Sequence, residues 1–178
     1  NIDVPSTATV IEANGQTVIP GLIDMHAHLL SGGFDTVSEK SMSYDPADQQ
    51  RALKQMLYWG ITTVYDPVQP LEQGLRLRDQ IASKVFPAPR LFISGPGFTA
   101  PGGWAGSNDP YARFEPTDLS EVKEQIETLA SAGIGIVKVF YDDMNVSFAQ
   151  TLPKLEEAMM QAIIGEARAH GMKVMVHA

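Results

Sequence analysis

Cysteine is absent from the 178 residues, and the chain also lacks a long apolar run. Without a thiol there can be no disulfide, no cysteine-ligated zinc or iron–sulfur centre and no thiol nucleophile. A membrane helix needs about 18 consecutive apolar residues, and no stretch approaches that length. No signal peptide is visible either. The lack of cysteine and of a signal favours the cytoplasm, and we expect no membrane partner.

Positive charge is scarce as well. The 13 Lys and Arg residues face 21 Asp and Glu residues, so the formal net charge is −8. A chain this acidic has no electrostatic footprint for nucleic acid or for an anionic membrane surface. Apolar residues make up 44% and charged residues 19%, which is typical of a globular domain with a sizeable core. The first residue is Asn1 rather than Met, and Ala178 follows an apolar run, so we expect a piece of a longer protein.

The first 20 residues predict a small β segment. Two apolar stretches, residues 9–12 and 17–19, flank Asn14-Gly15, and Asn-Gly is a strong signal for a two-residue hairpin. Pro20-Gly21 then ends the second stretch. Because an isolated hairpin is only marginally stable in water, we interpret residues 1–20 as a partial β segment at the edge of something larger.

From residue 21 onward the pattern alternates between strands and helices. Strands are predicted at 22–26, 61–65, 90–94, 136–141 and 173–177. Helices are predicted at 46–59, 70–84, 118–132 and 153–170, the third capped by Thr117 and several ending at glycine. Such alternation indicates βα units and a parallel sheet, either an open doubly wound sheet or a (β/α) barrel. A full barrel needs about 250 residues, so residues 21–178 would form a little over half of one.

Two histidines stand two positions apart at the end of the first predicted strand. Because strand side chains alternate, His26 and His28 share a face with Asp24. Two imidazoles held side by side form a ready pair of ligands for one metal ion. The competing interpretation is two surface histidines in a loop.

Two further histidines occupy different positions in their βα unit. His177 lies at the carboxyl end of the fifth strand, where barrel enzymes place catalytic groups, and together with the first pair it is a candidate metal ligand. Alone, it could equally be a satisfied core residue. His170 precedes Gly171 at a helix C-terminus, where a cation suits the helix dipole, so we interpret it as structural.

Lys138 interrupts a strand that should be buried. Burial of an unpaired ammonium is costly, and a buried lysine tends to lose its proton and become reactive. The functional interpretation is a lysine inside the barrel, neutral or carbamylated by CO₂; the alternative is a strand edge or a stem that reaches solvent. The Gly- and Pro-rich loop at 94–104 lacks the ending of a phosphate-binding loop. In a barrel, Phe98 and Trp104 of this loop could contact substrate.

Three aspartates, Asp66, Asp142 and Asp143, also follow predicted strands. They could support a metal ligand or a substrate. Solvated turn residues are the more frequent case, and we favour that interpretation for each.

The stretch PGLIDMHAH at residues 20–28 resembles the opening of the amidohydrolase superfamily of metal-dependent hydrolases on a (β/α)₈ barrel. GPGFT at 95–99 and VKVFYDD at 137–143 are similar to the imidazolonepropionase-like and Xaa-Pro dipeptidase-like branch. The resemblance implies a partial TIM barrel preceded by the remnant of a β-sandwich. It also implies that Lys138 is the carbamylated bridging lysine and that His177 is the ligand from the fifth strand.

The resemblance further implies a site for two divalent ions, with His26, His28, Lys138 and His177 as ligands, and zinc suits these donor types. Its expected reaction is hydrolysis of an amide, dipeptide or cyclic amide C–N bond in a small substrate by metal-activated water. The family pattern also needs a His after the sixth strand and an Asp base after the eighth, and the sequence ends at Ala178 before either. We therefore expect this piece alone to be inactive.

Two alternatives remain open from the residues. The chain could be a non-catalytic half-barrel whose open strand edges drive self-association, so we expect a homo-oligomer. An open doubly wound nucleotide-binding sheet is less well supported, because residues 28–33 do not match the Gly-x-Gly-x-x-Gly turn that such a site needs.

Overall fold

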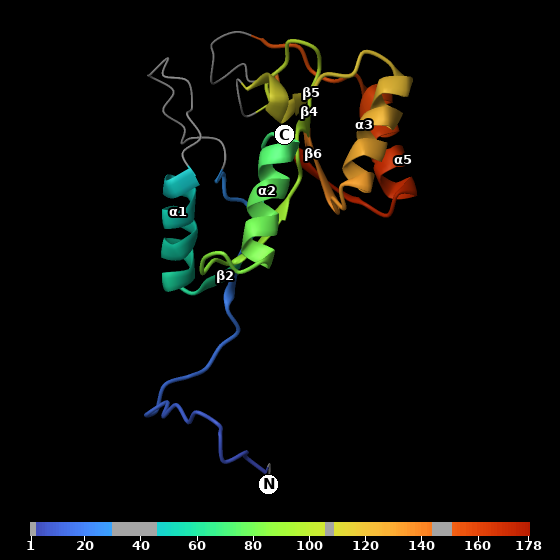
Figure 1. Cartoon of the computed structure of the whole chain (residues 1–178). Coiled ribbons are helices and arrows are strands. Elements are labelled where there is room, and N and C mark those ends of the chain that lie inside the picture. Colours follow the sequence, from blue (N-terminus) through green and yellow to red (C-terminus); the bar gives the residue numbers. More distant parts are fainter. Residues whose placement is uncertain (1–2, 30–45, 106–108, 144–150) are drawn as a thin grey trace.

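The computed structural model of the chain describes residues 3–29, 46–105, 109–143 and 151–178. Strands and helices alternate from residue 22 onward (Figure 1). The strands are β1 (Leu22–Asp24), β2 (Ile61–Asp66), β3 (Arg90–Ile93), β4 (Gly97–Phe98), β5 (Arg113–Phe114), β6 (Ile136–Phe140) and β7 (Lys173–His177). The α-helices are α1 (Pro46–Tyr58), α2 (Leu71–Ala82), α3 (Leu119–Ser131) and α5 (Glu157–Ala169), and a 3₁₀ turn covers Pro110–Ala112.

All strand pairs of the described residues are parallel, in two sheets with the orders β1-β2-β3 and β5-β4-β6-β7. Strands β3 and β4 are successive segments of one path, interrupted at Gly95, where φ is +70°. The strands therefore follow one another in space as they do along the chain, except for the short β5 added at one edge. A doubly wound sheet would reverse its order at a switch point. The fold is a partial (β/α) barrel, as the alternation of elements predicts.

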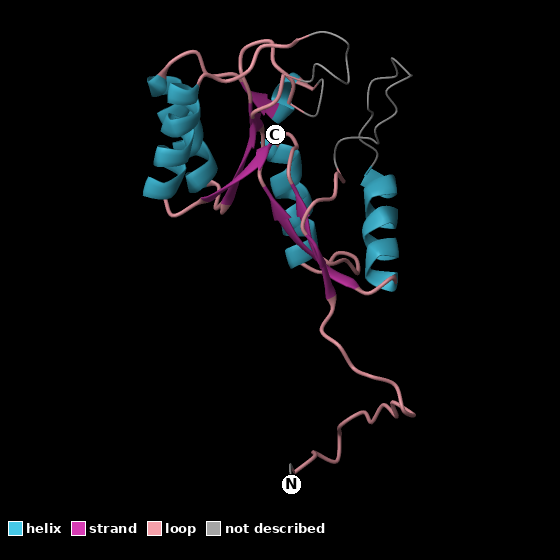
Figure 2. Ribbon diagram, turned by 180° about the vertical axis from the view of Figure 1, so that it is seen from behind, coloured by secondary structure: helices cyan, strands magenta, loops and turns pink. Residues whose placement is uncertain are grey.

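The helices cover the outer face of the strands. Figure 2 shows α3 and α5 together at one end of the row of strands, α1 at the other end and α2 between them. Side chains alternate along a strand, so Val137 and Val139 of β6 point toward the helices, where both are fully buried. The main core also contains residues of β2, β3 and all four helices, among them Val64, Leu91, Leu53, Leu77, Ile126 and Ile163. Lys138 and Phe140 point to the opposite face of the sheet, toward the barrel interior.

The predicted N-terminal hairpin is only half right. Asn14 and Gly15 form the turn with φ values of 45° and 81°, and the Gln16 N–H donates to the Ala13 carbonyl at 2.7 Å. No strand forms within residues 3–21, however, and this segment extends away from the rest of the molecule (Figure 1). Its apolar residues find no surface to pack against: Ile11 and Val18 are each 87% exposed. A turn without a packed face does not hold two strands together.

Two helix starts also differ from their predictions. The cap of α3 is Asp118 rather than Thr117: Asp118 Oδ1 accepts hydrogen bonds from the backbone N–H groups of Ser120 and Glu121 at 2.8 and 3.0 Å. The Thr117 N–H instead donates to the Glu121 carboxylate at 2.7 Å. Helix α5 begins at Glu157, not near residue 153. No helix in the described segments is both long and apolar enough to cross a membrane.

The predicted glycine stops are confirmed, and two short strands were missed. Gly60, Gly133 and Gly171 each follow a helix with positive φ, the conformation that glycine adopts without strain. Strand β4 lies within the loop predicted at 94–104, and β5 lies further along, before the predicted helix at 118–132, where no element is predicted. Each spans two residues, which is too short to leave an apolar periodicity in the sequence.

Candidate metal centre

His26 and His28 lie side by side just beyond β1. Their Nε2 atoms are 3.2 Å apart, and the rings meet edge to face with centroids 5.0 Å apart. The strand ends at Asp24, so the pair belongs to the segment that follows the strand and not to the strand itself. The path remains attached to β2, because the Ala27 N–H donates to the Tyr65 carbonyl at 3.0 Å. The imidazoles are adjacent, as the sequence predicts, but the backbone that carries them is not a β-strand.

Carboxylates on each side of the histidine pair hold this segment. The Asp24 carboxylate accepts a hydrogen bond from the His26 N–H at 3.0 Å. At the end of β2, the Asp66 carboxylate accepts one from the Leu29 N–H at 3.2 Å and is completely buried. The preference for a solvated turn residue at Asp66 is therefore wrong. Its apolar surroundings on β2 (VYDPV) were the available signal for burial.

Both imidazoles are biased toward the neutral form. Burial lowers the pKa of His28 to about 4, and the positive charges of His26, Lys138 and His177 add to the effect. Burial also lowers the pKa of His26, again with Lys138 and His177 contributing, while Asp24 opposes the shift. A neutral imidazole keeps a lone pair for a metal, so the chemistry of this donor pair fits a divalent cation.

Lys138 is buried in the middle of its sheet. Strand β6 lies between β4 and β7, and the residue is only 2% exposed, so the strand-edge alternative is wrong. Burial lowers the pKa of the Lys138 ammonium. Its Nζ lies 5.1 Å from the centroid of the Phe140 ring, and no carboxylate of the described residues forms an ion pair with it. An amine in such surroundings is more readily neutral and nucleophilic than one in water.

His177 ends β7 next to Phe140 of β6, as the register of the two strands requires. Its Nε2 lies 3.3 Å from Asp142 Oδ2, and its ring centroid is 4.9 Å from that of Trp104 and 5.5 Å from that of Phe140. Asp142 is therefore a partner of a candidate ligand, a role that sequence reasoning weighed and did not favour. Carboxylates commonly orient metal-binding histidines through such contacts.

The two aromatic residues predicted to approach substrate behave differently. Trp104 lies beside His177, with its ring edge on Phe140 at a centroid distance of 5.0 Å. Phe98 is completely buried and packs against Phe114 at 5.2 Å, so it belongs to the core. Only Trp104 is placed to contact a molecule at the site.

The four predicted ligands interact electrostatically, but they do not form a complete set of ligands for one metal ion in the described segments. The charges of Lys138 and His177 both contribute to the lowered pKa of His26 and of His28, so the four side chains are close enough to interact electrostatically. Within the described segments, however, no three His, Asp or Glu side chains gather closely enough to hold one metal ion. The pair of His26 and His28 is therefore the best-formed part of a metal centre.

His170 lies outside this site and makes polar contacts between two outer helices. It caps the C-terminus of α5, where Nδ1 lies 3.0 Å from the Glu166 carbonyl oxygen. Its Nε2 lies 2.9 Å from the carboxylate of Glu127 on α3. These contacts join two outer helices and support the structural interpretation.

The fold of parallel βα units agrees with the comparison against protein families. Residues 17–178 match the Amidohydrolase family, and the chain belongs to that family. No curated protein is similar enough in sequence to be matched.

Several solved structures share the fold. A crystal structure of an amidohydrolase is 24% identical with a TM-score of 0.78, covering 99% of this chain and 47% of that one. A prolidase complexed with N-methylphosphonate-L-proline is 23% identical with a TM-score of 0.76, covering 100% and 47%. A Xaa-Pro dipeptidase with methionine bound in its active site is 23% identical with a TM-score of 0.67, covering 89% and 43%. The chain thus spans less than half the length of each of these relatives.

Proposed function

We propose that the chain contributes the first half of the active site of a metal-dependent hydrolase that cleaves an amide, dipeptide or cyclic amide bond. The observation that carries this proposal is the pair of His26 and His28, with Nε2 atoms 3.2 Å apart in a chain of the Amidohydrolase family. Structurally similar proteins described as a prolidase and a Xaa-Pro dipeptidase support a small dipeptide-like substrate.

In this proposal His26 and His28 hold one divalent ion, and Lys138 and His177 take part in holding a second; zinc suits these donors. Bound metal supplies Lewis acidity, which makes water nucleophilic at neutral pH and polarises a carbonyl group. Asp142 holds the imidazole of His177 in place, 3.3 Å from its Nε2. Trp104 closes the site beside His177 with an apolar wall.

Lys138 is proposed to act as a carbamate. The neutral amine attacks the carbon of CO₂, a new N–C bond forms, one C=O π bond becomes a C–O⁻ group, and a proton leaves the nitrogen for solvent. Burial favours the neutral amine that this step needs. The carbamate would offer oxygen ligands to a divalent ion, and that ion would compensate the buried negative charge.

Metal content after dialysis against metal-free buffer tests the histidine pair. We expect at least one zinc ion per chain, falling below about a tenth of that value in His28→Ala, because two strong donors are needed to retain the ion. His170→Ala is the matched control, since His170 contacts Glu166 and Glu127 outside the site. Zinc retained equally by His28→Ala, or absent from the native chain, contradicts the proposal.

A ¹³C spectrum recorded with labelled bicarbonate tests the carbamate. A carbamate signal should appear in the native chain, persist in Lys173→Ala and vanish in Lys138→Ala. Lys173 is the matched control because it lies on the adjacent β7 and is exposed. A signal that survives Lys138→Ala would remove the bridging role of this lysine.

A second candidate, self-association of a non-catalytic half-barrel, is favoured by the strand edges. Strands β1 and β7 end their sheets, and apolar side chains remain exposed there: Leu22 at 53%, Ile23 at 62% and Val176 at 42%. An exposed apolar edge is a template for pairing with another chain. Sedimentation velocity should then show a homo-oligomer that Ile23→Lys shifts toward monomer. A native chain that stays monomeric at all concentrations excludes this candidate.

A further inference from the structure

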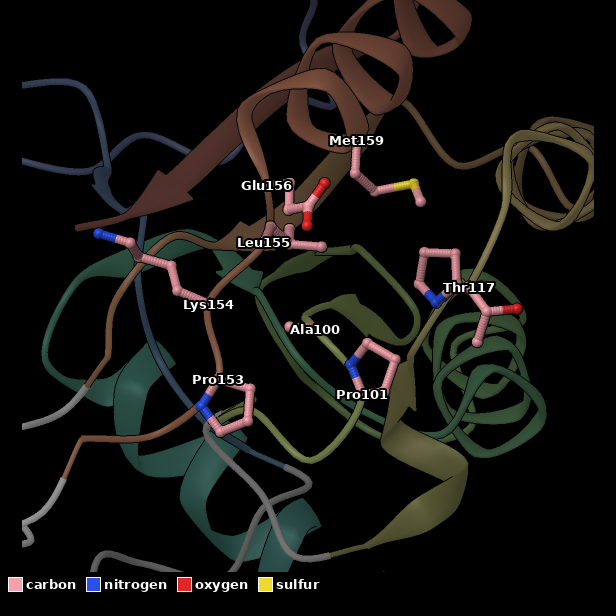
Figure 3. Close-up of a pocket in the computed structure, with 9 residues that line it drawn as sticks. Ala100, Pro101, Thr117, Pro153, Lys154, Leu155, Glu156 and Met159 are labelled. Atoms are coloured by element: carbon pink, nitrogen blue, oxygen red, sulfur yellow. The ribbon is translucent and has the colours of Figure 1, made fainter.

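A pocket of about 340 Å³ opens beside Ala100 and Pro101, which belong to the loop that continues to Trp104 (Figure 3). It lies between this loop, the start of α3 and the segment that leads into α5. Its lining residues are Ala100, Pro101, Pro116, Thr117, Pro153, Lys154, Leu155, Glu156 and Met159. None of the four predicted metal ligands is among them. The volume is within the range of small-molecule sites, about 300–1,000 Å³.

The walls of this pocket are apolar and stiff. Three of the lining residues are prolines, and a proline ring has little conformational freedom to lose when a ligand binds. Ala100 and Leu155 form part of the lining and are themselves 5% and 4% exposed, so they are set firmly in the core. Met159 adds an adaptable thioether. Such walls suit a compact apolar group.

One charged group of the pocket lining, the Glu156 carboxylate, has no hydrogen-bond or ion-pair partner among the described residues, whereas the other polar lining residues are engaged. Lys154 extends away from the other labelled residues in Figure 3, and its Nζ lies 4.8 Å from the centroid of the Tyr141 ring. The hydroxyl group of Thr117 donates to Glu121 at 3.1 Å. The Glu156 carboxylate, by contrast, lies between Leu155 and Met159 in the same view and does not cap α5. Neither a hydrogen bond nor an ion pair joins it to another described residue.

We propose that this pocket binds a small molecule that has an apolar body and a protonated amine, with the amine paired to Glu156. The proline-rich walls take the apolar body, and the carboxylate supplies the one charged acceptor. An anion would meet the Glu156 charge and the net charge of −8 on the chain, whereas the ammonium of Lys154, which also lines the pocket, lies over the Tyr141 ring. This inference concerns a site separate from the proposed metal centre and does not depend on hydrolysis.

The loop between the two sites connects them mechanically. The Gly103 N–H donates to the Ala100 carbonyl at 2.8 Å, and the Thr99 hydroxyl donates to the Trp104 carbonyl at 2.7 Å. A Cβ on Gly103 would lie 2.7 Å from the Pro153 carbonyl oxygen, so the loop rests directly on the pocket wall. A ligand that contacts Pro101 or Pro153 therefore touches the loop that holds Trp104, whose ring lies against His177.

Titration of the chain with benzylamine, followed by the ¹³C-methyl signal of Met159 and by tryptophan fluorescence, tests the proposal. Saturable shifts of Met159 are expected with benzylamine and not with benzoate. Glu156 is exposed, so Glu156→Gln should weaken binding by up to about fivefold, the upper end for an exposed charged pair. The matched control is Glu157→Gln, a neighbouring carboxylate outside the pocket lining, which should leave the affinity within about twofold.

The fluorescence change should disappear in Trp104→Phe while the Met159 shift remains, because the other tryptophan, Trp59, is 68% exposed at the end of α1. Benzoate binding as tightly as benzylamine, equal effects of the two glutamine variants, or no Met159 shift up to the solubility limit of benzylamine would each overturn the proposal. A Met159 shift in both native and Trp104→Phe chains without any fluorescence change would retain the pocket and overturn its connection to Trp104.

Discussion

Strands β6 and β1 both lead to proposed metal ligands, but they are held in different ways. Val137 and Val139 of β6 are completely buried under helices, whereas Leu22 and Ile23 of β1 are 53% and 62% exposed. Lys138 is therefore positioned by packing on both sides of its strand. The histidine pair is positioned by hydrogen bonds to the backbone beyond β1. Packing fixes a whole strand, while a few hydrogen bonds fix only the residues that they reach.

The largest expected loss of stability comes from a substitution in the core that supports β6. Ile126 of α3 is completely buried in the core that supports β6. Ile126→Ala should lower the free energy of unfolding by about 2–5 kcal/mol, the usual cost of a core cavity. Urea denaturation measures the change. Ile23→Ala in β1 is the control, and a loss above about 0.5 kcal/mol there would contradict the contrast.

A smaller loss of stability is expected when a hydrogen bond that holds the segment after β1 is removed. Asp66→Ala removes the acceptor of the Leu29 N–H and should cost about 1–3 kcal/mol, because a half-buried donor loses its partner and a buried side chain is truncated. Hydrogen exchange at the Leu29 amide should accelerate more than exchange in β6. Asp79→Ala, at a side chain that is 75% exposed on α2, should change stability by less than about 0.5 kcal/mol. Unchanged exchange at Leu29 would mean that another contact holds the segment.

The smallest effect is a pH dependence in the helices behind β6. Hydrogen bonding to the Glu166 carbonyl and to Glu127 raises the pKa of His170 above its ordinary value. A raised folded-state pKa stabilises the fold below the ordinary histidine pKa of about 6.5, and that contribution is lost as pH rises through the folded-state value. Stability of the native chain should therefore fall slightly between about pH 6 and pH 8 relative to His170→Gln. Equal pH profiles of the two proteins would contradict the assignment.

The alternation of elements could be predicted because each signal is local. Apolar runs such as residues 136–140 and glycine stops such as Gly133 depend on neighbours along the chain, and the structure follows them. The hairpin failed because Asn14-Gly15 specifies a turn, while pairing of its two arms needs a surface to pack on. The two-residue strands β4 and β5 escaped detection, since their pairing is decided by contacts with each other and with β6.

In the candidate site, too, the sequence predicts the residue types, whereas contacts between distant segments decide their surroundings. Residue types and spacing marked His26, His28, Lys138 and His177 as the residues to examine. Whether Asp66 is solvated or buried, and whether Phe98 or Trp104 faces the site, could not be predicted, because each depends on segments distant in sequence. The contact between Asp142 and His177 likewise joins the ends of two different strands.

By itself, the sequence determined the class of fold, the family resemblance and the residues that are candidate metal ligands, because periodicity and donor type are properties of short segments. The tertiary structure decided which strands are neighbours, how deeply Lys138 is buried and which carboxylates hold the histidines. It also brought residues 100–101, 116–117 and 153–159 together around one pocket. Those features arise from packing between segments far apart along the chain, which no local pattern encodes.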